Sequence, residues 1–183
     1  MFVVRTDLAY KLQPGQPMPK DAVSSLVLEP LDVSNNIVRF DTFASETSVL
    51  SSGAEVYELL FQIKGTWKLE PTHAVYASWQ VGKPEYEAAF IESRRQLFNV
   101  RQRVLPTFTY DWLLKRLDQV GSYLVLGLYG DEDGATRLCR EHPAIQQFTR
   151  SHLAETYSAV DITGLRCFRI EGQTLAAAHP NKA

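Results

Sequence analysis

The segment Pro106–Phe148, PTFTYDWLLKRLDQVGSYLVLGLYGDEDGATRLCREHPAIQQF, determines the expected fold. From Phe108 to Arg116, aromatic and aliphatic side chains recur at every second position, which is the period of a β-strand. Gly121 is free to take the positive φ of a tight turn. The almost wholly apolar run Tyr123–Tyr129 is typical of a strand buried on both faces. The segment therefore predicts a β-hairpin.

A helix in two segments is expected after this hairpin. Asp131 is suited to cap the helix, and the acidic residues that follow it suit the positive end of the helix dipole. His142 is pushed out of the helical region because it precedes Pro143. Pro143 is in turn well placed to open a second helical segment that ends near His152.

The flanking sequence completes a recognisable order of elements. His73–Val81 is a predicted strand, and a long amphipathic helix is expected between Pro84 and Pro106. Ile162–Glu171 is the last predicted strand. The order from residue 73 to residue 171 is β-α-β-β-α-β, which predicts an α+β fold with a ferredoxin-like unit. The arginines of the long helix are interpreted as a solvated basic face: Arg94, Arg95, Arg101 and Arg103.

The chain divides into three predicted parts. Residues 1–70 are expected to form an N-terminal antiparallel β extension, residues 71–172 the ferredoxin-like domain, and residues 173–183 a disordered tail. The predicted strands of the extension are Ser24–Val33, Ile37–Ala44, Glu55–Ile63 and Thr66–Leu69, with turns at Asn35-Asn36 and Lys64-Gly65. A degenerate second copy of the ferredoxin-like unit stays open as an alternative, although the extension lacks a long amphipathic helix.

Four motifs carry a resemblance to a known family: the helix end LPTF, the strand YDWLLKRLD, the turn and strand QVGSYLVLGLY, and the helical segment REHPAIQQF. In these the chain resembles the antibiotic biosynthesis monooxygenase-like family of dimeric α+β barrel proteins. The resemblance covers about residues 73–171, and its motifs mostly shape the fold. It implies a homodimer in which a second sheet covers the open face of the first. The N-terminal extension is the rival cover, which would give a monomeric pseudo-barrel.

The resemblance implies several activities. Some relatives oxygenate aromatic polyketide or quinol substrates without metal or flavin, others degrade haem, and others process small metabolites. The haem-degrading branch typically has a Trp and a His on the second helix and an Asn near the first strand. In this chain the second helix has no Trp, residues 72–74 supply no Asn, and His152 alone is a loose match. We therefore expect a small-molecule enzyme resembling cofactor-independent monooxygenases. The alternative is a non-catalytic binding or assembly module on the same scaffold.

Two sets of residues are candidates for the site. His142 and His152 are weak candidates for a general base, because a lone histidine is more often structural than catalytic. Substrate-binding candidates are aromatic residues from three predicted strands, and ordinary core packing is the rival interpretation: Trp79, Tyr110, Trp112 and Tyr129.

Composition limits the remaining classes of function. The 183 residues are 45% hydrophobic, enough for a substantial core, and the formal net charge of −2 argues against a nucleic acid or anionic membrane partner. Cys139 and Cys167 lack metal-ligand spacing and are expected to be free thiols in a reducing compartment. No apolar run approaches the roughly 20 residues that span a bilayer, and the N-terminus lacks a signal-peptide pattern. We expect a cytoplasmic protein with a small-molecule ligand, no metal and no cofactor.

Overall fold

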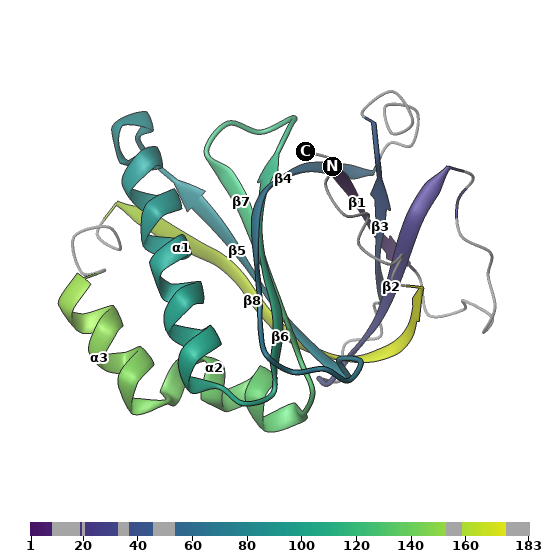
Figure 1. Cartoon of the computed structure of the whole chain (residues 1–183). Coiled ribbons are helices and arrows are strands. Elements are labelled where there is room, and N and C mark those ends of the chain that lie inside the picture. Colours follow the sequence, from purple (N-terminus) through teal and green to yellow (C-terminus); the bar gives the residue numbers. More distant parts are fainter. Residues whose placement is uncertain (9–18, 20, 33–36, 46–53, 153–158, 175–183) are drawn as a thin grey trace, which may run out of the picture.

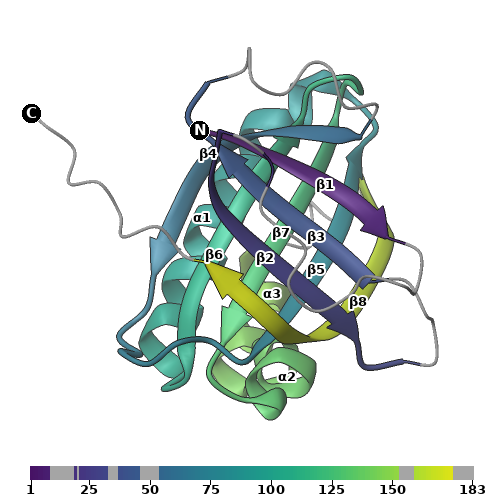
Figure 2. The ribbon, with the colours of Figure 1, turned by 90° about the vertical axis from the view of Figure 1, so that its right-hand side faces the viewer.

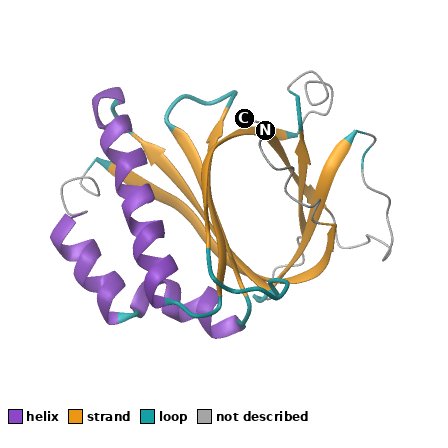
Figure 3. Cartoon of the chain, in the orientation of Figure 1, coloured by secondary structure: helices purple, strands orange, loops and turns teal. Residues whose placement is uncertain are grey.

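Eight antiparallel strands close into a barrel, and helices cover one side of it (Figure 1; Figure 3). This computed structural model describes residues 1–8, 19, 21–32, 37–45, 54–152 and 159–174, and every count of elements refers to those residues. The strands are β1 (Phe2–Leu8), β2 (Ala22–Pro30), β3 (Ile37–Phe43), β4 (Glu55–Lys64), β5 (His73–Val81), β6 (Phe108–Arg116), β7 (Ser122–Tyr129) and β8 (Val160–Thr174). The helices are α1 (Glu87–Val104), α2 (Cys139–Glu141) and α3 (Pro143–His152), with a 3₁₀ turn at Pro84–Tyr86 and a π-helical turn at Gly134–Leu138.

The second half of the chain confirms the ferredoxin-like prediction. Its strands lie in the order β8-β5-β7-β6. Counted along this half of the chain, the fourth strand (β8) is beside the first (β5), and the third (β7) is beside the second (β6). The helices lie on the outer face of this sheet (Figure 1). Helix α1 ends at Val104, and the next residue, Leu105, is extended with ψ 110° because Pro106 follows it. His142 is likewise extended, with ψ 131°, and separates α2 from α3.

The first half of the chain repeats the same sheet order without a described helix. Its strands lie in the order β4-β1-β3-β2, which is again fourth, first, third, second. The two halves join twice in the same way, because the second strand of each half pairs with the fourth strand of the other: β2 with β8, and β6 with β4. This approximate twofold relation favours the alternative of a degenerate second copy. Figure 2 shows β1, β2 and β3 crossing in front of the second sheet.

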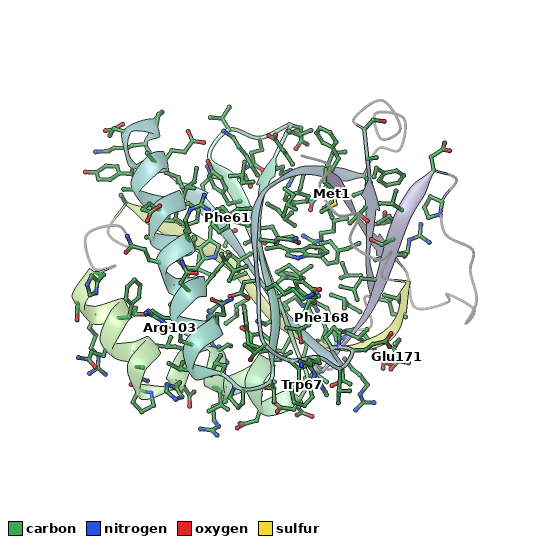
Figure 4. All side chains as sticks on the ribbon, in the orientation of Figure 1. Met1, Phe61, Trp67, Arg103, Phe168 and Glu171 are labelled. Carbon is green, nitrogen blue, oxygen red and sulfur yellow. The ribbon has the colours of Figure 1, made fainter. Side chains whose placement is uncertain are left out.

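A cluster of apolar side chains from both halves packs inside the barrel. Phe168 on β8 points into it (Figure 4), and it stacks on Tyr76 with ring centroids 5.1 Å apart. Leu28 and Phe40 from the first half pack in the same cluster. The sheet face that prompted the expectation of a homodimer is therefore covered by the chain's own strands. That removes the physical reason for a partner, so the homodimer is now implied by the family resemblance alone.

Several predictions on the first half need correction. Strand β1 was not predicted at all. Thr66–Leu69 is not a strand, because Gly65 donates its backbone N–H to the carbonyl of Thr109 at 2.7 Å and the chain continues beside β6 instead of folding back on β4. Gln173 and Thr174, assigned to the tail, extend β8 by pairing with β2. The predicted turn at residues 35–36 and the tail at 175–183 lie outside the described residues.

Candidate functional site

The predicted aromatic set divides between two faces of the second sheet. Tyr110 and Trp112 of β6 belong to the cluster inside the barrel. Trp79 of β5 and Tyr129 of β7 lie on the opposite face, beneath the helices. Successive side chains of a strand point to opposite faces of the sheet, so residues on opposite faces cannot line one cavity. The four residues therefore do not line a common site, and substrate binding by them stays a prediction.

A cavity of about 200 Å³ lies between the sheet and the helices. Strands β5, β7 and β8 form one wall, and α1, α2 and α3 form the other. The walls are mostly apolar and include Trp79 and Val125 from the sheet and Leu97 and Ile145 from the helices. Residues on β8, Ile162 and Leu165, also line the cavity although they are 56% and 42% exposed, so they mark its mouth.

Two arginines of α1 are buried against this cavity. Arg94 is 2% exposed, and its guanidinium lies over the ring of Trp79 at 4.7 Å and over that of Phe90 at 5.3 Å. Arg101, one heptad further on, also lines the cavity. The expectation of a solvated face was therefore wrong for these two residues. Positions 90, 94, 97 and 101 recur at intervals of three or four, which places them all on the buried face of the helix.

Arg101 is held by two fixed partners. Its Nε donates to the carbonyl of Cys139 at 3.1 Å, and its Nη1 donates to Oδ2 of Asp111 at 3.0 Å. The Asp111 side chain is fully buried, whereas that of Arg101 keeps 11% exposure. The pair ties α1 to α2 and to β6, so the guanidinium has a defined orientation at the edge of the cavity.

Asp111 lies behind Arg101, in a space that exists only because residue 127, opposite it on β7, is a glycine. Burial raises the pKa of Asp111 to about 6, although the neighbouring Arg101 guanidinium opposes the rise. Gly127 pairs with Asp111 across β6 and β7. A Cβ at this glycine would lie 2.6 Å from Oδ1 of Asp111 and 3.1 Å from the hydroxyl of Tyr129. Burial also raises the pKa of Tyr129 well above its usual value, so Tyr129 stays protonated at neutral pH.

Both cysteines lie near this cluster as free thiols, as predicted. The Sγ of Cys139 donates to the carbonyl of Ala135 at 3.2 Å, and the Sγ of Cys167 approaches the same oxygen at 3.7 Å. Burial raises the pKa of each thiol, which keeps the thiolate scarce at neutral pH. The two cysteines therefore pack and donate hydrogen bonds.

The predicted histidines lie elsewhere. His142 is half-buried between α2 and α3, where its Nδ1 accepts the backbone N–H of Ala144 at 3.3 Å. His152 is exposed at the end of α3, and its ring stacks on Phe148 with centroids 4.7 Å apart. Neither histidine is among the described residues that line the cavity. Their predicted role as a general base remains untested.

Neither a metal centre nor a membrane-spanning helix occurs in the described part of the chain. It contains no group of three or more His, Cys, Asp or Glu residues that is placed to hold a metal ion. None of its helices combines the length and apolar character needed to cross a bilayer.

A second hollow, of about 530 Å³, lies at the connection from β4 to β5. Tyr110 lines it together with Trp67 and with Lys64, whose Nζ lies 5.8 Å from the centroid of the Tyr110 ring. Unlike the cavity beneath the helices, it is lined by no buried charged side chain among the described residues. The cavity beneath the helices is therefore the stronger candidate site.

Fold and cavity together define a ferredoxin-like α+β barrel with a ligand-sized space between its sheet and its helices. No protein-family model matches the chain, and no curated protein matches it in sequence. Solved structures do match. An anthrone oxidase-like protein aligns with a TM-score of 0.67 and 11% identity, covering 97% of this chain and 96% of that one. An uncharacterised ferredoxin-fold protein from Listeria monocytogenes, related to antibiotic biosynthesis monooxygenases, aligns at 0.61 and 10%, covering 93% and 94%.

A heme-degrading enzyme from Listeria monocytogenes aligns with a TM-score of 0.58 and 11% identity, covering 92% of this chain and 99% of that one. These alignments span both halves of the chain. The resemblance to the ferredoxin-fold, antibiotic biosynthesis monooxygenase-like proteins is thus confirmed at the level of the fold. Identities this low do not transfer an activity.

Proposed function

We propose that the protein is a small-molecule enzyme of the oxygenase kind, which acts on an aromatic or quinone-like substrate in the cavity between sheet and helices. One observation carries the proposal: two arginines are buried beside Trp79 and apolar side chains that line a space of about 200 Å³. Burying charged groups is costly, and such groups gather at functional sites. The buried cluster inside the barrel, by contrast, consists of aliphatic and aromatic side chains that pack on one another.

The arrangement suits a reaction that passes through an anion. A phenol or hydroquinone becomes electron-rich when it loses a proton, and fixed guanidinium groups in a site of low dielectric constant stabilise the resulting charge. Arg101 is already oriented by Asp111 and by the carbonyl of Cys139, so no reorganisation is needed when charge develops. The fold shared with an anthrone oxidase-like protein supports this class of chemistry by analogy only.

Oxygen uptake tests the proposal directly. The pure protein is incubated with a panel of hydroquinones and anthrones, and dissolved oxygen is followed with an electrode. Trp79→Leu changes the cavity, whereas Trp112→Leu changes the barrel interior and serves as the matched control. We expect uptake in the wild type, a loss in Trp79→Leu and near-normal uptake in folded Trp112→Leu. Absence of uptake across the panel, or equal loss in both variants, would contradict the proposal.

A non-catalytic binding module is the second candidate. The exposure of Ile162 and Leu165 at the cavity mouth favours it, because apolar side chains at a rim also suit a docking ligand or protein. The same panel separates the two functions. A module binds aromatic compounds, as calorimetry would show, without consuming oxygen in their presence.

A further inference from the structure

We infer that the ligand of this cavity carries an acidic group, and that an aromatic acid of one or two rings places its carboxylate between Arg101 and Arg140. The inference rests on the proposed function, because it takes the cavity beneath the helices as the ligand site. It adds the chemical class of the ligand and the residues that recognise it.

The charged residues among the described lining of the cavity all carry positive charge. Three of its described lining residues are arginines: Arg94 and Arg101 from α1, and Arg140 from α2. No Asp or Glu is among the described lining residues, and Asp111 stands behind Arg101 rather than on the cavity wall. A cavity lined in this way attracts anions, and its low-dielectric walls strengthen the attraction.

Arg101 has a donor that remains available. Its Nε and Nη1 are engaged by Cys139 and Asp111, and within the described part of the chain its Nη2 donates to nothing. The side chain keeps 11% exposure and lines the cavity, so this nitrogen is the accessible one. A guanidinium held at two nitrogens presents the third in a fixed direction. Such preorganisation lowers the entropic cost of binding a carboxylate.

Arg140 supplies a second cation near the entrance. It follows directly after Cys139, whose carbonyl orients Arg101, and its side chain is exposed while still lining the cavity. Its Nη2 donates to the carbonyl of Thr136, which keeps the guanidinium close to the helix surface. An exposed cation beside buried ones draws an anion from solvent towards them.

The remaining walls set the size and character of the ligand body. Trp79 offers an aromatic face, and Leu97, Val125 and Ile145 are apolar. The volume of about 200 Å³ is somewhat larger than a cavity of about 150 Å³ that holds benzene. A compact aromatic body of one or two rings therefore fits, with its acidic group near the two arginines.

Calorimetry with a matched pair of ligands tests the inference. The probes are 2-naphthoate and its neutral analogue 2-naphthamide, titrated into the full chain at low and at high salt. We expect the acid to bind at least about tenfold more tightly at low salt, and this preference to shrink as salt rises. Arg140→Gln is expected to weaken acid binding about three- to tenfold and to leave amide binding unchanged.

Arg103→Gln is the matched control. Arg103 lies in the last turn of α1 (Figure 4), is exposed, and is not among the described residues that line the cavity. The control variant is expected to bind both probes as the wild type does. Arg101→Lys retains the positive charge but loses the planar guanidinium with its several N–H donors. In any folded sample of this variant, the preference for the acid over the amide should therefore fall. If Arg101→Lys does not fold, the binding of the two probes to Arg140→Gln tests the inference.

The outcomes separate this inference from the proposed function. Equal binding of acid and amide, or a preference that Arg140→Gln and Arg103→Gln reduce alike, overturns the inference and leaves an oxygenase acting on neutral substrates intact. An acid preference lost in Arg140→Gln, without oxygen uptake on hydroxynaphthoates, supports the inference and contradicts the enzyme. Absence of binding by both probes overturns the inference.

Discussion

Arg101 Nη1 lies 3.0 Å from Oδ2 of Asp111, and both side chains are enclosed between α1 and the sheet. The pair joins residues ten positions apart on different elements. The guanidinium of Arg101 lines the cavity, whereas the carboxylate of Asp111 that pairs with it lies behind the cavity wall. The geometry connects the folding of the helix layer to the electrostatics of the candidate site, because any change at Asp111 acts on the orientation of Arg101.

The first prediction concerns the pH dependence of stability. Burial raises the folded-state pKa of Asp111 to about 6 from its ordinary value of 3.8, so the folded protein holds this proton more tightly than the unfolded chain does. The contribution of Asp111 to the free energy of unfolding is therefore full below pH 3.8 and is lost as pH rises through about 6, a change of roughly 3 kcal/mol. Urea unfolding at several pH values measures it.

Asp111→Asn removes this proton and keeps the shape of the side chain. The free energy of unfolding of the wild type minus that of the variant should therefore fall between pH 4 and pH 7, and taking the difference cancels the other titrating groups. Parallel stability curves for the two proteins across this range would show that Asp111 has an ordinary pKa.

The second prediction concerns Gly127. An alanine there would place its Cβ 2.6 Å from Asp111 Oδ1 and 2.9 Å from Cε2 of Tyr129. Both neighbours are buried and have little room to move, so we expect Gly127→Ala to lower the free energy of unfolding by about 1–3 kcal/mol. Gly164→Ala is the control, because its Cβ would come no closer than 4.0 Å to Ser78. Equal denaturation midpoints for the two variants would refute the close packing at Gly127.

The second half of the fold was predictable because its signals are local. Alternation in Phe108–Arg116, the turn at Gly121 and the break before Pro143 each specify one element within a few residues. The first half lacks such signals. Its relation to the second half lies in the sheet order, which depends on pairing between distant strands. The extension was predicted as strands, and its role as a matching half of a closed barrel was only one of the alternatives that the sequence left open.

The candidate site was harder to predict than the fold. Arg94 and Arg101 were interpreted by their charge, although their spacing from Phe90 and Leu97 places them on the buried helical face. That periodicity was the signal that could have identified them. The pairing of Asp111 with Gly127 depends on strand register across a bulge, which single-sequence patterns do not specify. Trp79 alone of the predicted aromatic set lines the cavity.

The third prediction is a monomer in solution. The barrel closes within one chain, because β1 pairs with β4 and β2 pairs with β8, and the interior is filled. A second chain is not needed to cover the sheet. Light scattering after size exclusion at micromolar concentration should give the chain mass of 20.7 kDa. Twice that mass, unchanged on dilution, would instead support the homodimer that the family resemblance implies.

The last prediction separates structural and catalytic roles for His142. Its ring Nδ1 accepts the N–H of Ala144, and its carbonyl accepts those of Ile145 and Gln146, so it caps the first turn of α3. His142→Ala should therefore lower the free energy of unfolding by about 0.5–2 kcal/mol and leave oxygen uptake nearly unchanged. His142→Asn, which restores a capping oxygen, should recover most of the stability. A catalytic base would behave in the opposite way, because its loss lowers the rate about 100- to 10,000-fold. Uptake that collapses in both variants while their thermal unfolding matches the wild type would establish His142 as catalytic.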